Sequence, residues 1–399
     1  MTIPSLLDND FYKFTMQQAI HSAAARRTAR YLFVDRRGGL PADDLMLGLI
    51  RSRVGMLSKL ALSAAEADWL ARLGWFSDDY IAYLRDYRFD PGEVRIGRDS
   101  GGFLHVEVNG AWCRSILWEV PLLAIINQTW FETNAHGWSP DLRDYHRRSA
   151  SKGRALARAG CVFSDFGSRR RRNAAAQEVM LLAMRDDVAI GDAFAGTSNL
   201  HFARCLGLKP IGTVAHEWTM AFSAINSVAS ADRQALREWR AIYPGQPKIA
   251  LADTYGLDLF LANFDAQLAA DYDGVRHDSG DPRVFTDRVL EHYRRCGVDP
   301  RAKTLVFSDS LDENQASAIN RHVNQRARTA FGIGTRLTND FPDGETLDIV
   351  IKLDQLDGQE VAKLGEGNAK ATGSQSAVEN ARREVAHALA AHQNPQAND

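Results

Sequence analysis

The sequence predicts an α/β protein, and three features of its hydrophobic pattern support this prediction. Apolar residues recur at helical spacing over residues 13–27 and 57–87. Short, partly alternating apolar runs between about residues 93 and 117 are separated by glycine-containing turn signals, which indicates an antiparallel meander. From about residue 160, short apolar runs alternate with helical stretches, which is typical of a parallel sheet or a barrel. A chain of 399 residues is long enough for two domains.

Each predicted element rests on local signals. Ser63 followed by Glu66 is a capping-box signature, and Pro121 fits the first turn of a helix. The meander is predicted to have strands at 93–98, 103–109 and 112–117. The later strands are expected at or near residues 161–163, 209–211, 248–252, 273–275, 304–307 and 329–331. Residues 345–363 alternate again, and we expect them to return to the first domain before a final helix near 378–391.

The composition restricts the class of protein and its partners. The chain is 45% hydrophobic and 25% charged with a formal net charge of -2, which indicates neither a nucleic-acid-binding protein nor a membrane protein. Four cysteines lie far apart in the sequence, which predicts free, mostly buried thiols in a reducing compartment. Neither a membrane-spanning run nor a secretory signal is apparent, so a cytoplasmic location is expected, with a frayed polar tail.

Polar, glycine-rich segments follow each of the predicted later strands. Because the carboxyl ends of parallel strands meet at one edge, such segments are where α/β proteins place their active sites. The segment with the highest density of polar residues extends from Gly274 to Pro282. Asp278 could bind the vicinal hydroxyls of a ribose, while Arg276, Ser279 and Gly280 could bind a phosphate. The alternative interpretation of this string is a solvated turn.

Three other strings allow a structural or a functional interpretation. His216 can be a general base, a metal ligand, a phosphate acceptor or simply a structural histidine. Gly332–Arg336 resembles an anion cradle but also a helix-start turn. Arg169–Arg172 can form a solvated face or a nuclear signal, or it can hold a planar anion beside Phe166. Asp8, Asp10 and Tyr12 could be simple N-capping residues. No metal-binding cluster is evident.

Taken together, these strings resemble the nicotinate phosphoribosyltransferase family. The resemblance covers most of the chain, and eight motifs occur in the family's order: Leu7–Met16, Phe166–Arg170, Gly196–Asn199, Pro210–Trp218, Asp253–Gly256, Val275–Pro282, Phe307–Asp312 and Phe331–Asp340. It implies an irregular TIM-like α/β barrel (126–340) joined to an α/β sandwich domain that both chain ends form (1–125 with 341–399), in a homodimer.

The resemblance also implies a reaction. Nicotinate displaces diphosphate from phosphoribosyl pyrophosphate to give nicotinate mononucleotide for NAD biosynthesis, and ATP hydrolysis is coupled through a phosphohistidine, here His216. Substrate-bound Mg²⁺ would neutralise the diphosphate. The implied catalytic residues are His216, Arg276 and Asp278. The implied nicotinate-binding residues are Tyr12, Phe166, Arg169, Ser198, Thr213 and Arg276. The implied phosphoribosyl- and diphosphate-binding residues are Ser279, Gly280, Ser308, Gly332, Gly334 and Thr335.

One segment departs from the family pattern, and two rival functions remain. Where the family usually has Ser-Asp-Ser-Pro-Gly-Lys, this chain has Gly365–Lys370, which leaves the role of that loop open. The nearest rival is a nicotinamide phosphoribosyltransferase; relatives that use the amide carry Asp where this chain has Ser198, so the acid is favoured. A barrel hydrolase or aldolase that uses His216 and Asp278 as an acid–base pair is the other rival.

Overall fold

The computed structural model describes residues 2–134, 141–342, 346–366 and 370–393. Part of the Gly365–Lys370 loop and the predicted frayed tail lie outside these residues. The chain has a mixed α/β fold that divides into two compact units. Unit 1 comprises the chain up to Gly212 with Ser310–Glu313 and Gly332–Lys352, and unit 2 comprises Thr213–Asp309, Asn314–Phe331 and the chain from Leu353. The predicted domain bounds are not tested by this division.

Unit 1 contains an antiparallel sheet in which β10 (Ile349–Leu356), β1 (Thr28–Asp35), β3 (Leu104–Ala111) and β2 (Val94–Arg98) are neighbours in that order. The segment of β10 up to Lys352 belongs to this unit and pairs with its first strand, whereas the residues from Leu353 onward belong to unit 2. Strand β3 shows why the sheet forms: Leu104, Val106 and Val108 are buried while the residues between them are not, the period-2 pattern of a half-buried strand.

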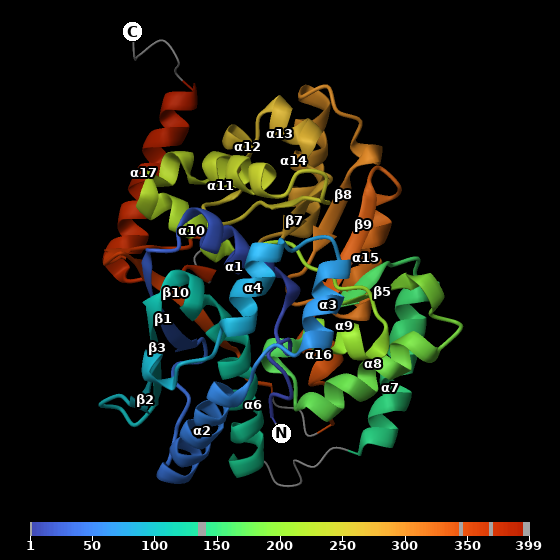
Figure 1. The fold of residues 1–399 in the computed structure, drawn as a ribbon. Helices are drawn as coiled ribbons and strands as arrows, with labels where there is room; N and C mark the ends of the chain where they lie inside the picture. Colours follow the sequence, from blue (N-terminus) through green and yellow to red (C-terminus); the bar gives the residue numbers. More distant parts are fainter. Residues whose placement is uncertain (1, 135–140, 343–345, 367–369, 394–399) are drawn as a thin grey trace. The chain divides into compact units, whose positions relative to one another are not determined.

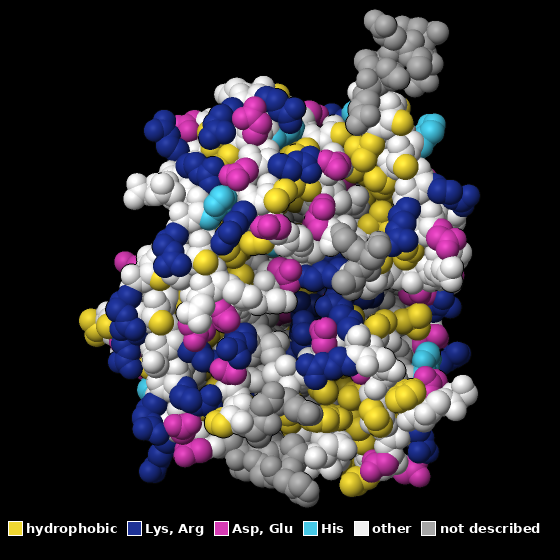
Figure 2. Space-filling model, turned by 180° about the vertical axis from the view of Figure 1, so that it is seen from behind, with side chains coloured by type: hydrophobic (Ala, Val, Ile, Leu, Met, Phe, Trp, Pro, Cys, Tyr) yellow, Lys and Arg dark blue, Asp and Glu magenta, His cyan; other side chains and the backbone are white. Residues whose placement is uncertain are grey.

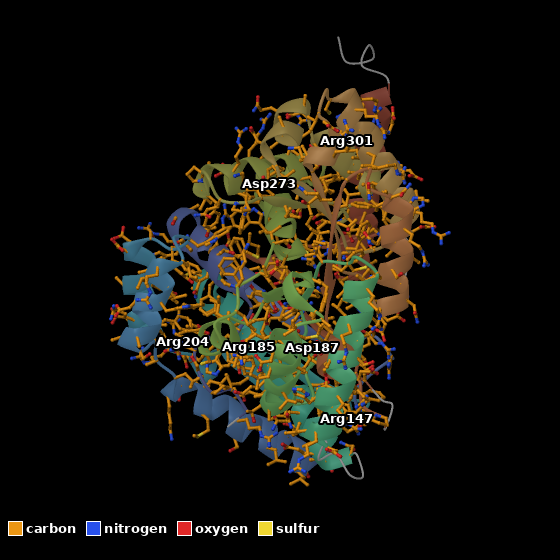
Figure 3. All side chains as sticks on the ribbon, turned by 90° about the vertical axis from the view of Figure 1, so that its right-hand side faces the viewer. Arg147, Arg185, Asp187, Arg204, Asp273 and Arg301 are labelled. Carbon is orange, nitrogen blue, oxygen red and sulfur yellow. The ribbon has the colours of Figure 1, made fainter. Side chains whose placement is uncertain are left out.

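Parallel strands occur in both units. In unit 2, β6 (Ile249–Leu251), β7 (Gly274–His277), β8 (Thr304–Phe307) and β9 (Arg328–Ile333, whose last two residues belong to unit 1) pair in parallel in that order. In unit 1, β4 (Phe163–Asp165) and β5 (Phe194–Thr197) pair in parallel. Asp273, labelled in Figure 3, directly precedes β7 and connects its start to the starts of β6 and β8. Its carboxylate accepts from the Lys248 N–H (2.7 Å), and its carbonyl accepts from the Thr304 N–H (2.9 Å).

The helices follow the predicted alternation (Figure 1). Those of unit 1 are α1 (Phe11–Ala23), α2 (Asp44–Met56), α3 (Ala64–Arg72), α4 (Asp78–Asp86), α5 (Trp112–Ser115), α6 (Glu119–Asn134), α7 (Leu142–Arg158), α8 (Ala174–Asp186), α9 (Leu200–Leu206) and α16 (Thr335–Thr338). Those of unit 2 are α10 (His216–Ile225), α11 (Val228–Ile242), α12 (Leu257–Asn263), α13 (Ala266–Asp271), α14 (Pro282–Arg295), α15 (Glu313–Val323, whose first residue belongs to unit 1) and α17 (Gln375–Gln393).

Local signals explain several helix ends. Ser63 and Glu66 form the predicted capping box at α3, since the Ser63 side chain accepts from the Glu66 N–H and the Glu66 carboxylate accepts from the Ser63 N–H. In unit 2, α17 packs on α11 and α12 around small buried residues such as Ala231 and Ala381, so its backbone approaches its neighbours closely (Figure 1).

One prediction about the meander and two about later strands are wrong. Residues 112–117 form helix α5 and a 3-10 turn, because Trp112, Ile116 and Leu117 are all buried and no exposed face alternates with them. The third meander strand is instead β1, which pairs with β3 from Thr28↔Ala111 to Leu32↔Glu107. Residues 209–211 contribute only an isolated bridge between Pro210 and Thr197, and a short strand, β11 (Gln359–Glu360), stands where a longer one was expected.

Surface composition agrees with the balanced charge of the sequence. On the face drawn in Figure 2, Lys and Arg side chains are interspersed with Asp and Glu. Among the described residues, no helix combines the length and the apolar character that crossing a membrane requires. Cys113 and Cys161 are buried as predicted, whereas Cys205 is exposed and Cys296 is partly exposed; all four thiols are free.

Gly274 at the start of β7 permits close pairing with β8. A Cβ atom at this position would lie 1.9 Å from the carbonyl oxygen of Thr304. We predict that Gly274→Ala lowers the free energy of unfolding by about 1–3 kcal/mol or more, because the two backbones must separate. Urea denaturation measures this. Gly97→Ala, in strand β2 with no atom within 4 Å of the added Cβ, is the matched control. Equal effects of the two substitutions would contradict the explanation.

Candidate active site

The predicted site residues gather into two clusters, one in each unit. The His216 cluster of unit 2 contains His216, Thr213, Arg276, Asp278, Ser279, Gly280 and Ser308, together with Asp253, Thr254 and Lys363. The Phe166 cluster of unit 1 contains Tyr12, Phe166, Arg169, Ser198, Gly332, Gly334 and Thr335, together with Asp10, Glu119 and Asp165.

Parallel strands bring the His216 cluster together, as the sequence predicts. Asp253 follows β6, Asp278 follows β7 and Ser308 follows β8, so their side chains share one edge of the sheet. The Ser308 hydroxyl donates to Asp278 Oδ1 (2.8 Å) and accepts from Arg276 Nε (2.7 Å). Arg276 also donates to Asp278 Oδ1 (3.1 Å) and to Thr213 Oγ1 (2.8 Å). Arg276 therefore fixes Asp278 from one side.

His216 is the first residue of α10 and is buried beside these strand ends. Its Nδ1 lies 3.0 Å from Thr254 Oγ1, and its Nε2 lies 3.2 Å from Asp278 Oδ2 and 2.8 Å from Lys363 Nζ. Burial first, and the neighbouring Lys363 next, lower the pKa of His216 to about 4. The imidazole is therefore neutral at pH 7, which leaves one ring nitrogen with a free lone pair.

The ammonium of Lys363 lies among the acidic groups of this cluster. Donor atoms of His216, Asp253 and Asp278 lie within 4.8 Å of one another, a grouping that the sequence interpretation did not foresee. The Lys363 ammonium is 3.4 Å from Asp253 Oδ2 and 3.9 Å from Asp278 Oδ2. Burial opposes ionisation of Asp278, but Arg276, His216 and Lys363 outweigh it and hold its pKa well below the usual range. The two carboxylates are thus ionised and balanced by Lys363 and Arg276.

The described part of the divergent segment covers the predicted phosphate loop. Ser279 donates to Asp253 and accepts from the backbone N–H of Glu366 (2.9 Å). Gly280 has a φ of +87°, and a Cβ there would lie 2.7 Å from Glu366 Cβ, so both backbone conformation and space require glycine. Lys370 Nζ donates to the Asp278 carbonyl (2.9 Å) and pairs with Asp309 (2.5 Å).

In the Phe166 cluster, glycines make room for an aromatic ring. The Phe166 N–H donates to the carbonyl of Ile333 (2.9 Å), so the turn after β4 lies against the end of β9 within unit 1. A Cβ on Gly332 would lie 2.4 Å from the Phe166 ring, and one on Gly334 would lie 3.2 Å from the Phe166 carbonyl oxygen. Gly332 is thus required for packing on Phe166, a side chain at Gly334 would make a tight contact there, and Thr335 begins the short helix α16 directly after them.

Arg169 is tied to a buried carboxylate that the sequence interpretation missed. Glu119 lies 2.9 Å from Arg169 and 2.7 Å from Lys13. Burial opposes ionisation of Glu119, but Lys13 and Arg169 lower its pKa to about 2. Burial and the Glu119 charge raise the pKa of the half-buried Tyr12, so its hydroxyl stays protonated. Arg169 keeps further N–H donors in its guanidinium fork, which Glu119 orients.

Two further carboxylates organise the turns that carry Phe166 and Ser198. Asp165 accepts from the Gly167 N–H, the Gln177 side chain and the Thr197 hydroxyl, each at 2.8 Å. Asp10 accepts from the Ser198 hydroxyl (2.7 Å), and burial raises its pKa. Asp10 precedes α1 but makes no side-chain cap bond, so the simple N-capping interpretation is wrong for this residue.

The run of four arginines is not a solvated face. Arg171 and Arg172 are each 1% exposed. Arg171 pairs with Asp8 (2.5 Å), which is therefore an ion-pair partner rather than a cap, and Arg172 donates to Asn339 (2.7 Å). The interpretation as a surface or nuclear-signal run fails because two buried guanidiniums here find acceptors inside unit 1.

Among the residues that sequence reasoning missed, Asp253, Thr254 and Asp165 carried a signal, because each lies in a polar segment that follows a predicted strand. Asp253 follows an apolar run directly, like the other strand-end residues, and lies in a motif that carries the family resemblance. Lys363 and Glu119 are distant in sequence from the groups they neutralise, and their local sequence gives no indication of that role.

The comparisons with known proteins agree with this geometry. Residues 161–388 match the nicotinate phosphoribosyltransferase (NAPRTase) family, and residues 7–127 match the NAPRTase N-terminal domain. The chain is 39% identical over 392 residues to a nicotinate phosphoribosyltransferase of Methanococcoides burtonii, with 94% of this chain and 96% of the relative covered. It is 40% identical over 380 residues to one of Serratia proteamaculans, with 92% of each covered. The crystal structure of nicotinate phosphoribosyltransferase from Porphyromonas gingivalis superposes with a TM-score of 0.91 at 32% identity, covering 96% of this chain and 99% of that chain.

The fold and these matches place the chain among the phosphoribosyltransferases. More narrowly, the chain belongs to the nicotinate phosphoribosyltransferase family. It is an enzyme of NAD biosynthesis whose activity is nicotinate phosphoribosyl transfer. The hydrolase or aldolase interpretation is thereby set aside.

Asp165 makes the stability of the protein pH-dependent. Burial raises its pKa from 3.8 to about 6, so the folded chain takes up a proton between pH 6 and 4 that the unfolded chain does not. The stabilisation is full below pH 4 and is lost as pH rises through 6. We predict that, between pH 4 and 7, the free energy of unfolding of the wild type falls by about 3 kcal/mol relative to that of Asp165→Asn, as measured by urea denaturation. The exposed Asp192→Asn is the control, and parallel pH profiles for wild type and Asp165→Asn would contradict the prediction.

Proposed function

We propose that the transfer from phosphoribosyl pyrophosphate to nicotinate is coupled to ATP hydrolysis through transient phosphorylation of His216. The observation that supports this most directly is the state of His216, a buried, neutral imidazole with an ammonium 2.8 Å from one ring nitrogen. A neutral imidazole is nucleophilic, and a nearby cation can neutralise the oxygens of a phosphoryl group attached to it.

We assign nicotinate recognition to Tyr12, Phe166, Arg169, Ser198, Thr213 and Arg276. Phe166 offers an aromatic face for the pyridine ring. The guanidiniums of Arg169 and Arg276 are each oriented by a carboxylate, Glu119 and Asp278 respectively, and a guanidinium has the fork geometry that matches a carboxylate.

The phosphoribosyl group is assigned to the strand-end loops. Asp278, which is ionised, would accept from the ribose hydroxyls or stabilise positive charge that develops at C1. Phosphate contacts are assigned to Ser279, Gly280, Ser308, Gly332, Gly334 and Thr335. Since Gly332 and Gly334 also pack on Phe166, their backbone would serve the ring and the phosphate together.

Mg²⁺ is proposed to arrive with the diphosphate of the substrate rather than in a site of its own. Nitrogen and carboxylate donors of His216, Asp253 and Asp278 converge, but the Lys363 ammonium already lies among them at 2.8–3.9 Å. We therefore assign no step of the reaction to a protein-held metal in this cluster.

The finer architecture is also part of the proposal. The family resemblance favours an irregular barrel over residues 126–340 and a sandwich domain from 1–125 with 341–399. It also favours a cytoplasmic homodimer in which Tyr12 reaches the site of the partner subunit. Size-exclusion chromatography with light scattering tests the dimer.

We predict strong selectivity for nicotinate over nicotinamide, with kcat/KM higher by about 100-fold or more. Ser198 carries no charge that would repel the nicotinate carboxylate, and its hydroxyl is already held by Asp10. Steady-state assays with the acid and the amide at saturating phosphoribosyl pyrophosphate and Mg²⁺ measure this ratio. Comparable turnover of the amide would identify the chain as a nicotinamide phosphoribosyltransferase instead.

His216→Ala is predicted to lower nicotinate-stimulated ATP hydrolysis by about 100-fold or more while leaving slow, ATP-independent transfer, because the phosphoryl acceptor is lost but the strand-end loops remain. The measurement is release of inorganic phosphate and of nicotinate mononucleotide, with and without ATP. His322→Ala, in α15 and outside both clusters, is the matched control. ATP coupling that survives in His216→Ala would refute the assignment.

A further inference from the structure

The Nε2 atom of His216 lies within hydrogen-bond distance of two groups that favour different protonation states of this nitrogen. Lys363 Nζ is 2.8 Å away and can only donate a hydrogen bond, whereas Asp278 Oδ2 is 3.2 Å away and, when ionised, can only accept one. A neutral imidazole has one N–H, on Nδ1 or on Nε2. A lone pair on Nε2 satisfies Lys363, and a proton on Nε2 satisfies Asp278, so the two neighbours favour different tautomers.

The other ring nitrogen does not decide between these tautomers. Nδ1 lies 3.0 Å from the hydroxyl of Thr254, which can donate or accept. The contacts of Nε2 therefore decide which tautomer is favoured. Here Asp278 has other donors, since Arg276 and Ser308 both bind its Oδ1, while the shorter contact of Nε2 is with Lys363.

Lys363 is held in this position by backbone contacts on both sides. Its own N–H and carbonyl exchange hydrogen bonds with Thr372 (both 2.9 Å). The N–H groups of Leu364 and Gly365 then donate to the carbonyl of Thr254 (2.8 and 3.2 Å), the residue whose hydroxyl faces Nδ1. The same segment thus fixes the ammonium and the hydroxyl at opposite nitrogens of one ring, and the Lys363 side chain is only 4% exposed.

We propose that Lys363 is a positioning residue that selects the tautomer of His216 with the proton on Nδ1, and that it thereby makes Nε2 the nitrogen that accepts the phosphoryl group. The first part rests on contacts within unit 2 alone. The second part rests on the proposed function. The neutral state of His216 at pH 7 is the condition for either tautomer to exist.

The chemical step follows from this arrangement. The ammonium moves its hydrogen bond from Nε2 to an oxygen of the incoming γ-phosphoryl group of ATP. The freed Nε2 lone pair then forms a bond to phosphorus, and the bond from phosphorus to the ADP oxygen breaks with its electron pair on that oxygen. The ring keeps its proton on Nδ1, so it carries one positive charge, and Asp253 and Asp278 lie nearby to balance that charge.

The test is the tautomer of His216, read by NMR from ring-¹⁵N-histidine in the full-length protein at pH 7, with the His216 signals assigned by their loss in His216→Gln. We expect Nδ1–H in the wild type and a shift of the proton to Nε2 in Lys363→Met, where the neighbours left to Nε2 are the carboxylates of Asp278 (3.2 Å) and Asp253 (3.8 Å), which can only accept. Lys370→Met is the matched control, since Lys370 contacts Asp278 and Asp309 but not His216, and its spectrum should match the wild type. Lys363→Arg, which retains a donor, should keep the proton on Nδ1.

A wild-type spectrum with the proton on Nε2 overturns the proposal, whether or not Lys363→Met folds. Retention of Nδ1–H in a folded Lys363→Met also overturns it, because the lysine would then not select the tautomer. Incubation with ATP separates this proposal from the function that it deepens. If the wild type has Nδ1–H but is never phosphorylated on His216, the coupling fails and the tautomer assignment stands. If it is phosphorylated, we expect the phosphoryl group on Nε2 and at least a tenfold loss of labelling in Lys363→Met; phosphorylation on Nδ1 overturns the second part.

Discussion

The buried ammonium of Lys363 lies among Asp253, Asp278 and His216, and the His216 cluster depends on this charge balance. Two carboxylates without a counter-charge at this depth would cost several kcal/mol each in lost solvation, or would take up protons. Lys363 and Arg276 keep both of them ionised. The same lysine contributes to the low pKa of the histidine, so one cation keeps the acids charged and the base neutral. A pair of ionised carboxylates beside a neutral imidazole is the starting state from which the proposed phosphoryl acceptance would proceed.

The Phe166 cluster uses the same principle with the signs reversed. There, one buried carboxylate, Glu119, serves two cations, Lys13 and Arg169, and holds the guanidinium near the turn that carries Phe166. Asp165 fixes that turn through three uncharged donors. Burial raises the pKa of both carboxyl groups. The uncharged donors offset burial only in part at Asp165, whose pKa rises, whereas the two cations outweigh it at Glu119, whose pKa falls.

Sequence reasoning predicted the structural features that short-range or periodic sequence patterns encode. The capping box of α3, the strands β6 to β9 and the polar residues that follow them are encoded within a few positions, and parallel pairing then brings Asp278 and Ser308 together without further information. It failed where long-range packing decides. Residues 112–117 became a helix because every side of the segment is buried, and β1 was missed because its pairing with β3 supplies the alternation that its own sequence lacks. Lys363 lies 147 positions from His216, and no local pattern predicts which of 48 basic residues will be buried there.

Asp253 and Asp278, the two acidic residues of the His216 cluster, have different partners and are not interchangeable. Asp278 Oδ1 is held by Arg276 and Ser308, so only Oδ2 is directed at the imidazole, and its charge is already shared with a guanidinium. Asp253 accepts from Ser279, in the predicted phosphate loop, and lies nearer to Lys363. A ligand that draws the Ser279 hydroxyl toward a phosphate oxygen would leave Asp253 with Lys363 as its main partner and would strengthen that pair. The hold of the ammonium on Nε2 would weaken correspondingly. Occupation of the predicted phosphate loop and release of the histidine lone pair would thus be linked through the contacts of Ser279 with Asp253, of Asp253 with Lys363 and of Lys363 with His216, without movement of a whole domain.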